Sequence, residues 1–134
     1  MGLNFVAGIS KNGAEVTKDY PESGYLGLRT DEAGPVDLFN FWASYSCSAG
    51  ALKGLGLGFG GNSSSEYLTI NRSNIGSFAL PAYQVFNASL SYTGSKYFLA
   101  LKVNNLTDQT YYSGWSTVTP QNLRNASISL NYRF

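Results

Sequence analysis

Carboxylates are the side chains in this 134-residue sequence that come closest to a catalytic set. Most of them cluster in or beside the segment 17–35. A suitably spaced Asp/Glu pair is all that glycoside hydrolysis requires, so a carbohydrate hydrolase is one hypothesis. We favour the interpretation that they are solvated charges of exposed loops. The eight carboxylates are Glu15, Asp19, Glu22, Asp31, Glu32, Asp37, Glu66 and Asp108.

Other catalytic and metal-binding chemistry has few side chains to support it. The sequence contains no histidine, the usual general base, and Cys47 is its single cysteine. This composition excludes a disulfide within the chain and any His or multi-Cys metal site. We interpret Cys47 as a small apolar filler, and the glycine run 54–61 as strand because no helix follows it. No catalytic residue, metal or cofactor is therefore expected.

The composition is unusual for a soluble domain. Only 13% of the residues are charged, about half the roughly 25% typical of soluble proteins, while 15% are aromatic. The net charge of +1 gives no indication of a nucleic-acid partner. Uncharged polar groups must therefore cover the surface, or part of it must not face water.

Two kinds of membrane-related segment are missing from the sequence. No stretch approaches the roughly 20 apolar residues of a membrane helix, and polar residues follow Met1 too soon for a signal peptide. An exported protein needs a leader. We therefore expect a mature form, an expressed portion, or the tail of a longer protein.

The apolar residues repeat with a period of two, which predicts β-strands rather than helices. In each predicted strand large apolar side chains occupy one face, while Gly, Ser, Asn and other polar residues occupy the other. Long alternation and frequent glycine argue against any helix. The predicted strands are 3–16, 36–46, 52–64, 83–92, 96–106 and 125–134.

The connections alternate between short and long. The segments 47–51 and 93–95 are rich in small residues and suit hairpins. The segments 17–35, 65–82 and 107–123 are long and hold all four prolines. Long structureless loops are uncommon in compact domains and usually carry function. The pattern predicts an antiparallel up-and-down sheet with two unlike ends.

Aromatic residues on the apolar face fall at one height, beside the short turns. They are Tyr45, Tyr92, Tyr97, Tyr132 and Phe134. No Lys or Arg falls in mid-strand on this face, where it would cost about 2–4 kcal/mol at the centre of a bilayer. Bacterial outer-membrane barrels combine such a belt with short periplasmic turns and long extracellular loops. The pattern favours a barrel over a soluble β-sandwich, which stays open as the alternative.

Six strands are too few for a closed barrel, because the smallest bacterial barrels have about eight. Unpaired edge groups in lipid cost several kcal/mol each, so this sheet cannot span a bilayer alone. The chain is therefore expected to be the last part of something larger. The strand glycines, such as Gly56 and Gly58, either allow another segment to approach closely or merely ease sheet curvature; both readings stay open.

Several motifs resemble the C-terminal end of the TonB-dependent outer-membrane receptors, the siderophore-receptor branch above all. They are "LPAYQVFNASLSY", "YFLALKVNNLTDQTYY" and the terminal "SISLNYRF", preceded by the strand "LKGLGLGFGG". Within them Leu80, Pro81 and Tyr83 match a Leu-Pro-x-Tyr start of a late strand. The Asn104–Asp108 step and the Tyr111–Tyr112 pair also match. The likeness extends from about Phe39 to Phe134 and is weaker before that.

The resemblance implies an all-β antiparallel meander of about six strands within a transmembrane barrel of about 22 strands. Residues 1–134 would be the C-terminal portion of that barrel, without its plug domain, TonB box and earlier strands. The implied function is TonB-dependent uptake of a ferric siderophore or similar chelate, with no enzymatic activity. The implied partners are the remaining strands and plug, outer-membrane lipid, the barrel-assembly machinery, and TonB only through the absent segments. The implied location is the bacterial outer membrane.

The resemblance also assigns a role to the closing strand. Outer-membrane proteins of this kind end in an aromatic residue preceded by apolar residues at every second position, and the assembly machinery reads that strand. The matching residues are Ile128, Leu130, Tyr132 and Phe134.

Arginine and aromatic residues in the long loops are candidates for ligand contact, because they suit an anionic, partly flat metal chelate. The alternative is that they form an upper aromatic belt or pack the loops. The candidates are Tyr25, Arg29, Tyr67, Arg72, Tyr111 and Trp115. Besides the sandwich and the hydrolase, a fragment that self-associates through its open edges stays a further possibility.

Overall fold

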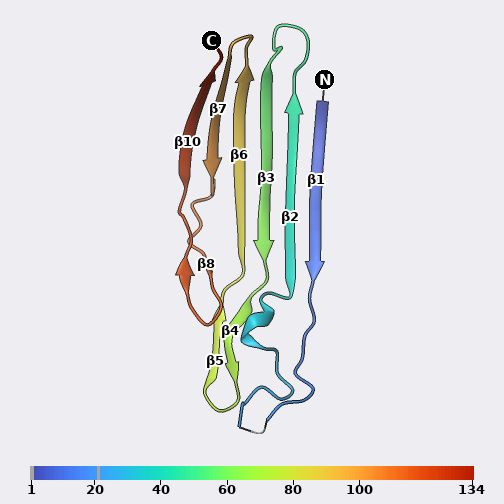
Figure 1. Ribbon diagram of the computed structural model, residues 1–134, viewed down its shortest axis with the longest axis vertical. Coiled ribbons are helices and arrows are strands. Elements are labelled where there is room, and N and C mark those ends of the chain that lie inside the picture. Colours follow the sequence, from blue (N-terminus) through green and yellow to red (C-terminus); the bar gives the residue numbers. More distant parts are fainter. Residues whose placement is uncertain (1, 21) are drawn as a thin grey trace.

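The chain forms one long antiparallel sheet with its extended loops gathered at one end (Figure 1). The computed structural model describes residues 2–20 and 22–134. Met1 and Pro21, the latter one of the prolines expected in the long connections, lie outside the described residues. The sheet strands are β1 (Gly2–Lys11), β2 (Asp37–Ser46), β3 (Leu55–Ser64), β6 (Tyr83–Thr93), β7 (Tyr97–Asn104) and β10 (Asn125–Tyr132).

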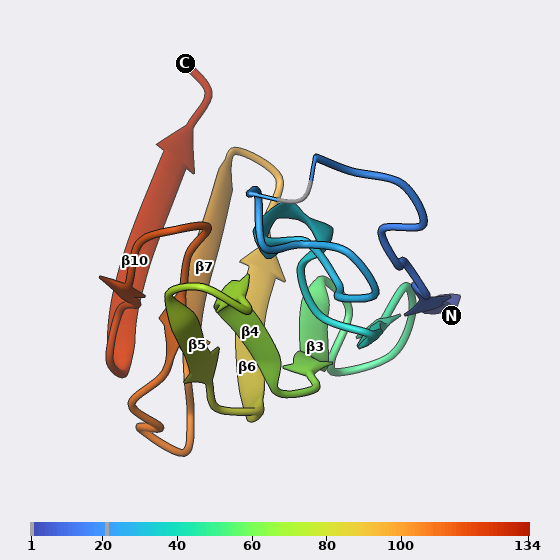
Figure 2. The same cartoon turned by 90° about the horizontal axis from the view of Figure 1, so that it is seen from below.

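The strands follow one another in the order β1-β2-β3-β6-β7-β10, so every pairing is between neighbours along the meander. The predicted fold, an up-and-down all-β sheet of six strands, is confirmed. Figure 2 shows the N-terminal and C-terminal strands at opposite sides of the open sheet. Both outer strands therefore keep one edge without a partner strand among the described residues.

The register places the predicted apolar residues of all six strands on one side. One row runs through the pairings Phe5–Ala43–Phe59–Ala88–Val103–Ala126. A second row pairs Leu90 with Leu101, and Leu101 with Ile128. Because side chains alternate along a strand, the intervening residues form the opposite side. We call these two sides the apolar face and the polar face.

The first predicted strand was too long, because β1 ends at Lys11 instead of Val16. After that point the chain leaves the sheet. The Asn12 amide still donates to the Val36 carbonyl (2.8 Å), but Val16 pairs with Leu28 of the following loop instead. The connection between β2 and β3 is also longer than predicted, since β3 begins only at Leu55.

The long connections contain secondary structure that the sequence reading missed. The 65–82 segment holds a hairpin of β4 (Tyr67–Arg72) and β5 (Gly76–Leu80). The segment before β2 holds a short 3-10 helix, η1 (Asp31–Ala33), and the 107–123 segment pairs β8 (Tyr112–Ser113) with β9 (Thr119–Pro120). Within residues 2–20 and 22–134, no helix has the length and apolar character needed to cross a membrane.

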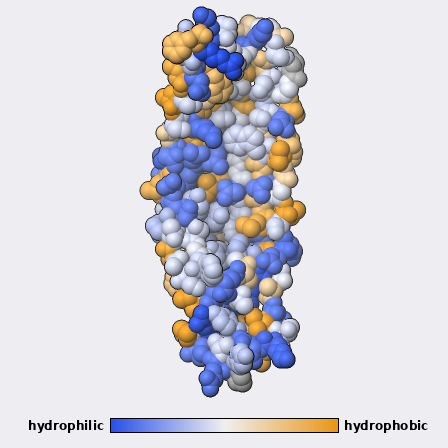
Figure 3. Space-filling model, viewed as in Figure 1, coloured by the Kyte–Doolittle hydropathy of each residue, from blue (hydrophilic) through white to orange (hydrophobic). Residues whose placement is uncertain are grey.

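The apolar face is not covered by a second layer of the described chain. Leu3, Ile9 and Ile128 on it are 75%, 84% and 75% exposed. Within the described residues the buried hydrophobic side chains are Leu80 and Val85, both near the loop end. Figure 3 shows hydrophilic and pale residues over much of the centre of the visible side, with hydrophobic residues along its margins. The soluble sandwich expected as the alternative would need a second sheet on this face.

The glycines of β3 make room for a tryptophan. A Cβ placed on Gly58 would lie 2.5 Å from Cζ2 of Trp42, and one on Gly60 would lie 2.5 Å from Cε3 of the same ring. Real Cβ atoms essentially never come that close to a neighbour. The glycines therefore allow a side chain of the same sheet to approach closely. That side chain is the Trp42 indole, which lies against β3 on the polar face.

Candidate functional site

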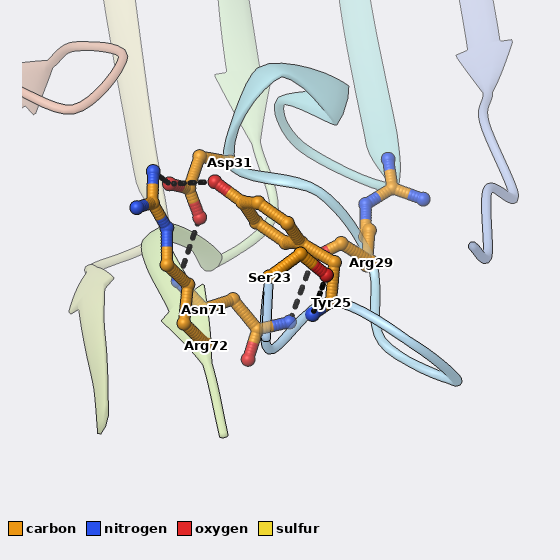
Figure 4. A network of polar contacts seen from close by, with 6 residues as sticks. All are labelled: Ser23, Tyr25, Arg29, Asp31, Asn71 and Arg72. Atoms are coloured by element: carbon orange, nitrogen blue, oxygen red, sulfur yellow. Dashed lines mark hydrogen bonds and ion pairs between the residues drawn. The ribbon is translucent and has the colours of Figure 1, made fainter. Parts of the chain in front are cut away.

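The long loops meet around a buried carboxylate, Asp31, which is 2% exposed (Figure 4). It accepts hydrogen bonds from the Asn71 backbone amide (2.7 Å) and the Tyr25 hydroxyl (3.1 Å). The Arg72 guanidinium lies 3.3 Å from its second oxygen. Burying a carboxylate is costly unless its charge is paired and hydrogen-bonded, and here it is both. The reading of this carboxylate as a solvated loop charge is therefore wrong.

Tyr25 and Arg72 also contact each other. The guanidinium carbon of Arg72 lies 4.8 Å from the centre of the Tyr25 ring, a cation–π arrangement. Burial raises the pKa of the Tyr25 hydroxyl, and its hydrogen bond to Asp31 and the charge of Asp31 raise the pKa further. The Nε atom of Arg72 is buried and has no hydrogen-bond partner in the described part of the chain.

Arg29 is used to hold its own loop. Its guanidinium donates to the backbone carbonyls of Asn12 (2.7 Å) and Ala33 (3.1 Å), and also to Gly34 and Pro35. The Arg29 carbonyl in turn accepts from the Asn71 side-chain amide (2.8 Å). The Arg29 side chain therefore holds Asn12 and the 33–35 backbone together, and its backbone carbonyl links this loop to β4 through Asn71.

The hairpin also contacts the last long loop. The Tyr67 hydroxyl donates to the Gly114 carbonyl (3.0 Å) and accepts from the Gly114 amide (3.1 Å). The Tyr111 ring packs on Tyr83 with centroids 4.7 Å apart. Trp115, at the tip between β8 and β9, is 63% exposed. The β4–β5 hairpin therefore connects the first and third long loops into one cap.

The six candidate ligand residues fall into two groups. Tyr25 and Arg72 contact Asp31, and Arg29 joins the same network through Asn71, while Tyr67, Tyr111 and Trp115 lie with the last loop. Most of their polar atoms contact the protein itself, which is the packing role considered as the alternative. Contact with a ligand stays a prediction for all six. Asp31 was missed because its partners Asn71 and Arg72 lie some 40 positions away along the chain.

The proposed assembly residues lie on the exposed apolar face of an edge strand. Ile128, Leu130 and Tyr132 belong to β10, and Phe134 follows it with its ring 5.3 Å from that of Tyr132. All four side chains are exposed. Their role in assembly stays a prediction.

The arrangement offers little for catalysis or metal binding. Across residues 2–20 and 22–134, no group of three or more His, Cys, Asp or Glu side chains is close enough to hold a metal ion. Asp31 is occupied by three partners, and Asp19 and Asp108 are also engaged in contacts within the protein.

The solved structures that resemble this chain over most of its length include the following two. P. aeruginosa FpvA bound to heterologous pyoverdines matches with a TM-score of 0.64 and 22% identity, covering 81% of this chain. The FpvAI–pyocin S2 complex matches with a TM-score of 0.67 and 23% identity, covering 79% of this chain. In both, this chain spans only 15% of the length of the matched chain. No protein-family model and no curated protein matches the sequence.

FpvA is a TonB-dependent siderophore receptor of the outer membrane, and it is not an enzyme. At 22–23% identity, this similarity supports a shared fold. The six-stranded antiparallel sheet, with its short turns at one end and long loops at the other, therefore has the fold of a segment of a TonB-dependent siderophore-receptor barrel.

Proposed function

We propose that this chain is the C-terminal segment of an outer-membrane receptor barrel that takes up a ferric siderophore or similar chelate in a TonB-dependent manner. The plug, the TonB-contacting segment and the earlier strands would belong to other parts of the receptor. The chain itself would carry no catalytic activity.

The observation that carries this proposal is the exposed apolar face. It crosses all six strands and holds Leu57, Leu90, Leu101 and Ile128 in one continuous row of pairings. Burial of apolar surface is worth about 25 cal/mol per Å², so a face of this extent would not stay in water. Bilayer hydrocarbon is the environment that fits a β-sheet whose loops lie at one end and whose aromatic belt lies at the other.

The loop cap supports a role in ligand binding. In a closed barrel the long loops would stand at the extracellular opening, where a chelate arrives. Trp115 and Tyr20 remain well exposed there and are available for contact. FpvA is described in a complex with a pyoverdine and iron, which makes a metal chelate the first ligand class to test.

The two edge strands define the expected partners. The open edge of β10 would pair with the first strand of the barrel, and the open edge of β1 with the preceding one. The residues Ile128 to Phe134 would present the aromatic-ended strand to the barrel-assembly machinery before closure.

The proposal can be tested with nitroxide spin labels on neighbouring residues of β7. Labels replace Leu101, on the apolar face, and Lys102, on the polar face, in a Cys47→Ser background and in the full receptor within membranes. Oxygen concentrates in lipid, whereas a nickel chelate stays in water. We expect oxygen to relax the label at 101 and the nickel chelate to relax the label at 102.

The matched pair gives each result a meaning. Equal access of the nickel chelate to both labels would contradict the membrane location. Protection of the label at 101 from both reagents would instead favour the soluble β-sandwich, because a second protein layer would then cover the apolar face.

A further inference from the structure

A small cavity opens on the polar face where the sheet meets the loops. It has a volume of about 240 Å³ and is lined mainly by asparagines from β3, β6, β7, β10 and the loop before β10. The lining residues are Asn62, Val85, Asn87, Asn104, Asn105, Tyr111, Asn122 and Asn125. We call this cavity the amide pocket. It lies apart from the Asp31 network and contains none of its residues.

Part of the amide pocket is fixed by hydrogen bonds within the protein. Asn105, which is buried and has a positive φ of 53°, donates from its side chain to the carbonyls of Gln109 (2.9 Å) and Asn122 (3.2 Å). Its backbone amide donates to the Asn87 side-chain oxygen (3.0 Å). The Asn104 side chain donates to that of Asn125 (2.9 Å). These contacts hold part of the pocket wall in place within the protein itself.

Other amide groups in the pocket wall keep their capacity to form hydrogen bonds. Among the described residues, no hydrogen bond uses the Asn122 side-chain amide, the Asn87 side-chain nitrogen or the Asn104 side-chain oxygen. The pocket thus presents both donors and acceptors, and its lining carries no charge. Ions would find no opposite charge there, whereas a hydroxyl group, which donates and accepts at once, would match these amides.

The volume of the pocket and its aromatic side chain further restrict the kind of ligand that it can bind. Pockets for whole drug-sized molecules measure about 300–1,000 Å³, so this one suits a single small group. The volume corresponds to about eight water molecules at roughly 30 Å³ each. Tyr111 and Val85 supply apolar surface beside the amides. We propose that the amide pocket binds one neutral, polyhydroxylated ring such as a sugar.

The test uses the longest natural form of the protein that contains this chain, purified in detergent. The probes are the methyl glycosides of glucose, galactose and N-acetylglucosamine, with glucuronate as a charged comparison. Saturation-transfer NMR reports which of them contact the protein. We expect transfer to at least one neutral glycoside and weaker transfer to glucuronate.

The variant Asn122→Leu replaces a pocket amide with an apolar side chain of similar size. It leaves the hydrogen bond from Asn105 in place, because that bond is accepted by the Asn122 backbone carbonyl. We expect about three- to tenfold weaker binding, the effect of losing one hydrogen bond. Asn131→Leu is the control, since Asn131 lies on the polar face of β10 at the far end from the pocket. An unchanged affinity in Asn122→Leu, or no transfer to any neutral glycoside, would overturn the proposal. Neither result would bear on the spin-label test of the receptor barrel.

Discussion

At the scale of single residues, the loop cap depends on one buried charge. Asp31 is surrounded by groups from two separate loops, and its nearest ionic partner, Arg72, is about one-third exposed. A carboxylate in this position loses its hydration on burial, and three contacts with the protein replace the lost water. The contacts join η1 to β4 and thereby set the relative position of the first loop and the hairpin.

We predict that Asp31→Asn loosens this junction while leaving the sheet intact. The neutral side chain loses the ion pair, and we expect a local cost of about 1–3 kcal/mol, because the exposure of Arg72 reduces the value of a buried pair. Hydrogen exchange of the Asn71 amide should accelerate accordingly. Trypsin should cut faster after Arg29 and Arg72.

Glu32→Gln is the matched control, since Glu32 is the next residue along the chain and is exposed. It changes the net charge by the same amount without altering the Asp31 contacts. If both variants exchange at the wild-type rate, the Asp31 network does not hold the loops.

A second residue-scale prediction concerns pH. The pKa of Tyr25 is raised in the folded protein, first by burial and then by its hydrogen bond to Asp31. The neutral phenol is thus favoured by folding, and its stabilisation is complete below the ordinary phenol pKa of about 10. It is lost as the pH rises through the higher folded value.

The check is the phenolate absorbance of the wild type minus that of Tyr25→Phe. We expect this difference to appear at a higher pH than the ordinary phenol value in the folded protein, and at the ordinary value after unfolding. In Asp31→Asn the difference should shift part of the way back, because burial remains. A Tyr25 titration at the ordinary value in the folded protein would contradict the network.

At the scale of elements, the period-two pattern was sufficient to place the six sheet strands and their faces. It failed where tertiary contacts, rather than the local sequence pattern, decide the structure. The β4–β5 hairpin mixes polar and apolar residues, and β1 ends at Lys11, whose partner Asp37 is the first residue of β2. The Asp31 network was beyond sequence reasoning altogether, since its partners meet only after the loops fold together.

The pairing of Trp42 with the glycines of β3 gives an element-scale prediction. In Gly60→Ala the new Cβ would lie 2.3 Å from the Phe41 carbonyl oxygen and 2.5 Å from the Trp42 ring. The strands must shift, which we expect to cost about 1–3 kcal/mol. The measurement is the urea midpoint for unfolding of the receptor in detergent.

Gly13→Ala provides the control, because a Cβ there meets nothing within 4 Å. Trp42→Ala combined with Gly60→Ala should recover only part of the loss, since the Phe41 carbonyl contact remains. Equal midpoints for Gly60→Ala and Gly13→Ala would show that the close approach has no energetic weight.

At the scale of the whole molecule, one sheet has two faces that require different surroundings. Leu101 lies near the middle of β7 on the apolar face, between Leu90 and Ile128. Ser129 lies on the polar face of the adjacent strand, opposite Ala100. The two positions are at nearly the same height and differ chiefly in the face to which they point.

This pair yields the sharpest prediction about the membrane. Leu101→Arg would place a charge in hydrocarbon at a cost of about 2–4 kcal/mol, whereas Ser129→Arg would place it toward the barrel interior. We therefore expect the first variant to reduce folded receptor in the outer-membrane fraction strongly and the second to leave it nearly unchanged. The measurement is the amount of receptor that keeps its folded electrophoretic mobility before heating. Equal yields from the two variants would mean that the apolar face does not meet lipid, because an arginine in hydrocarbon loses the hydration that the polar face would still provide.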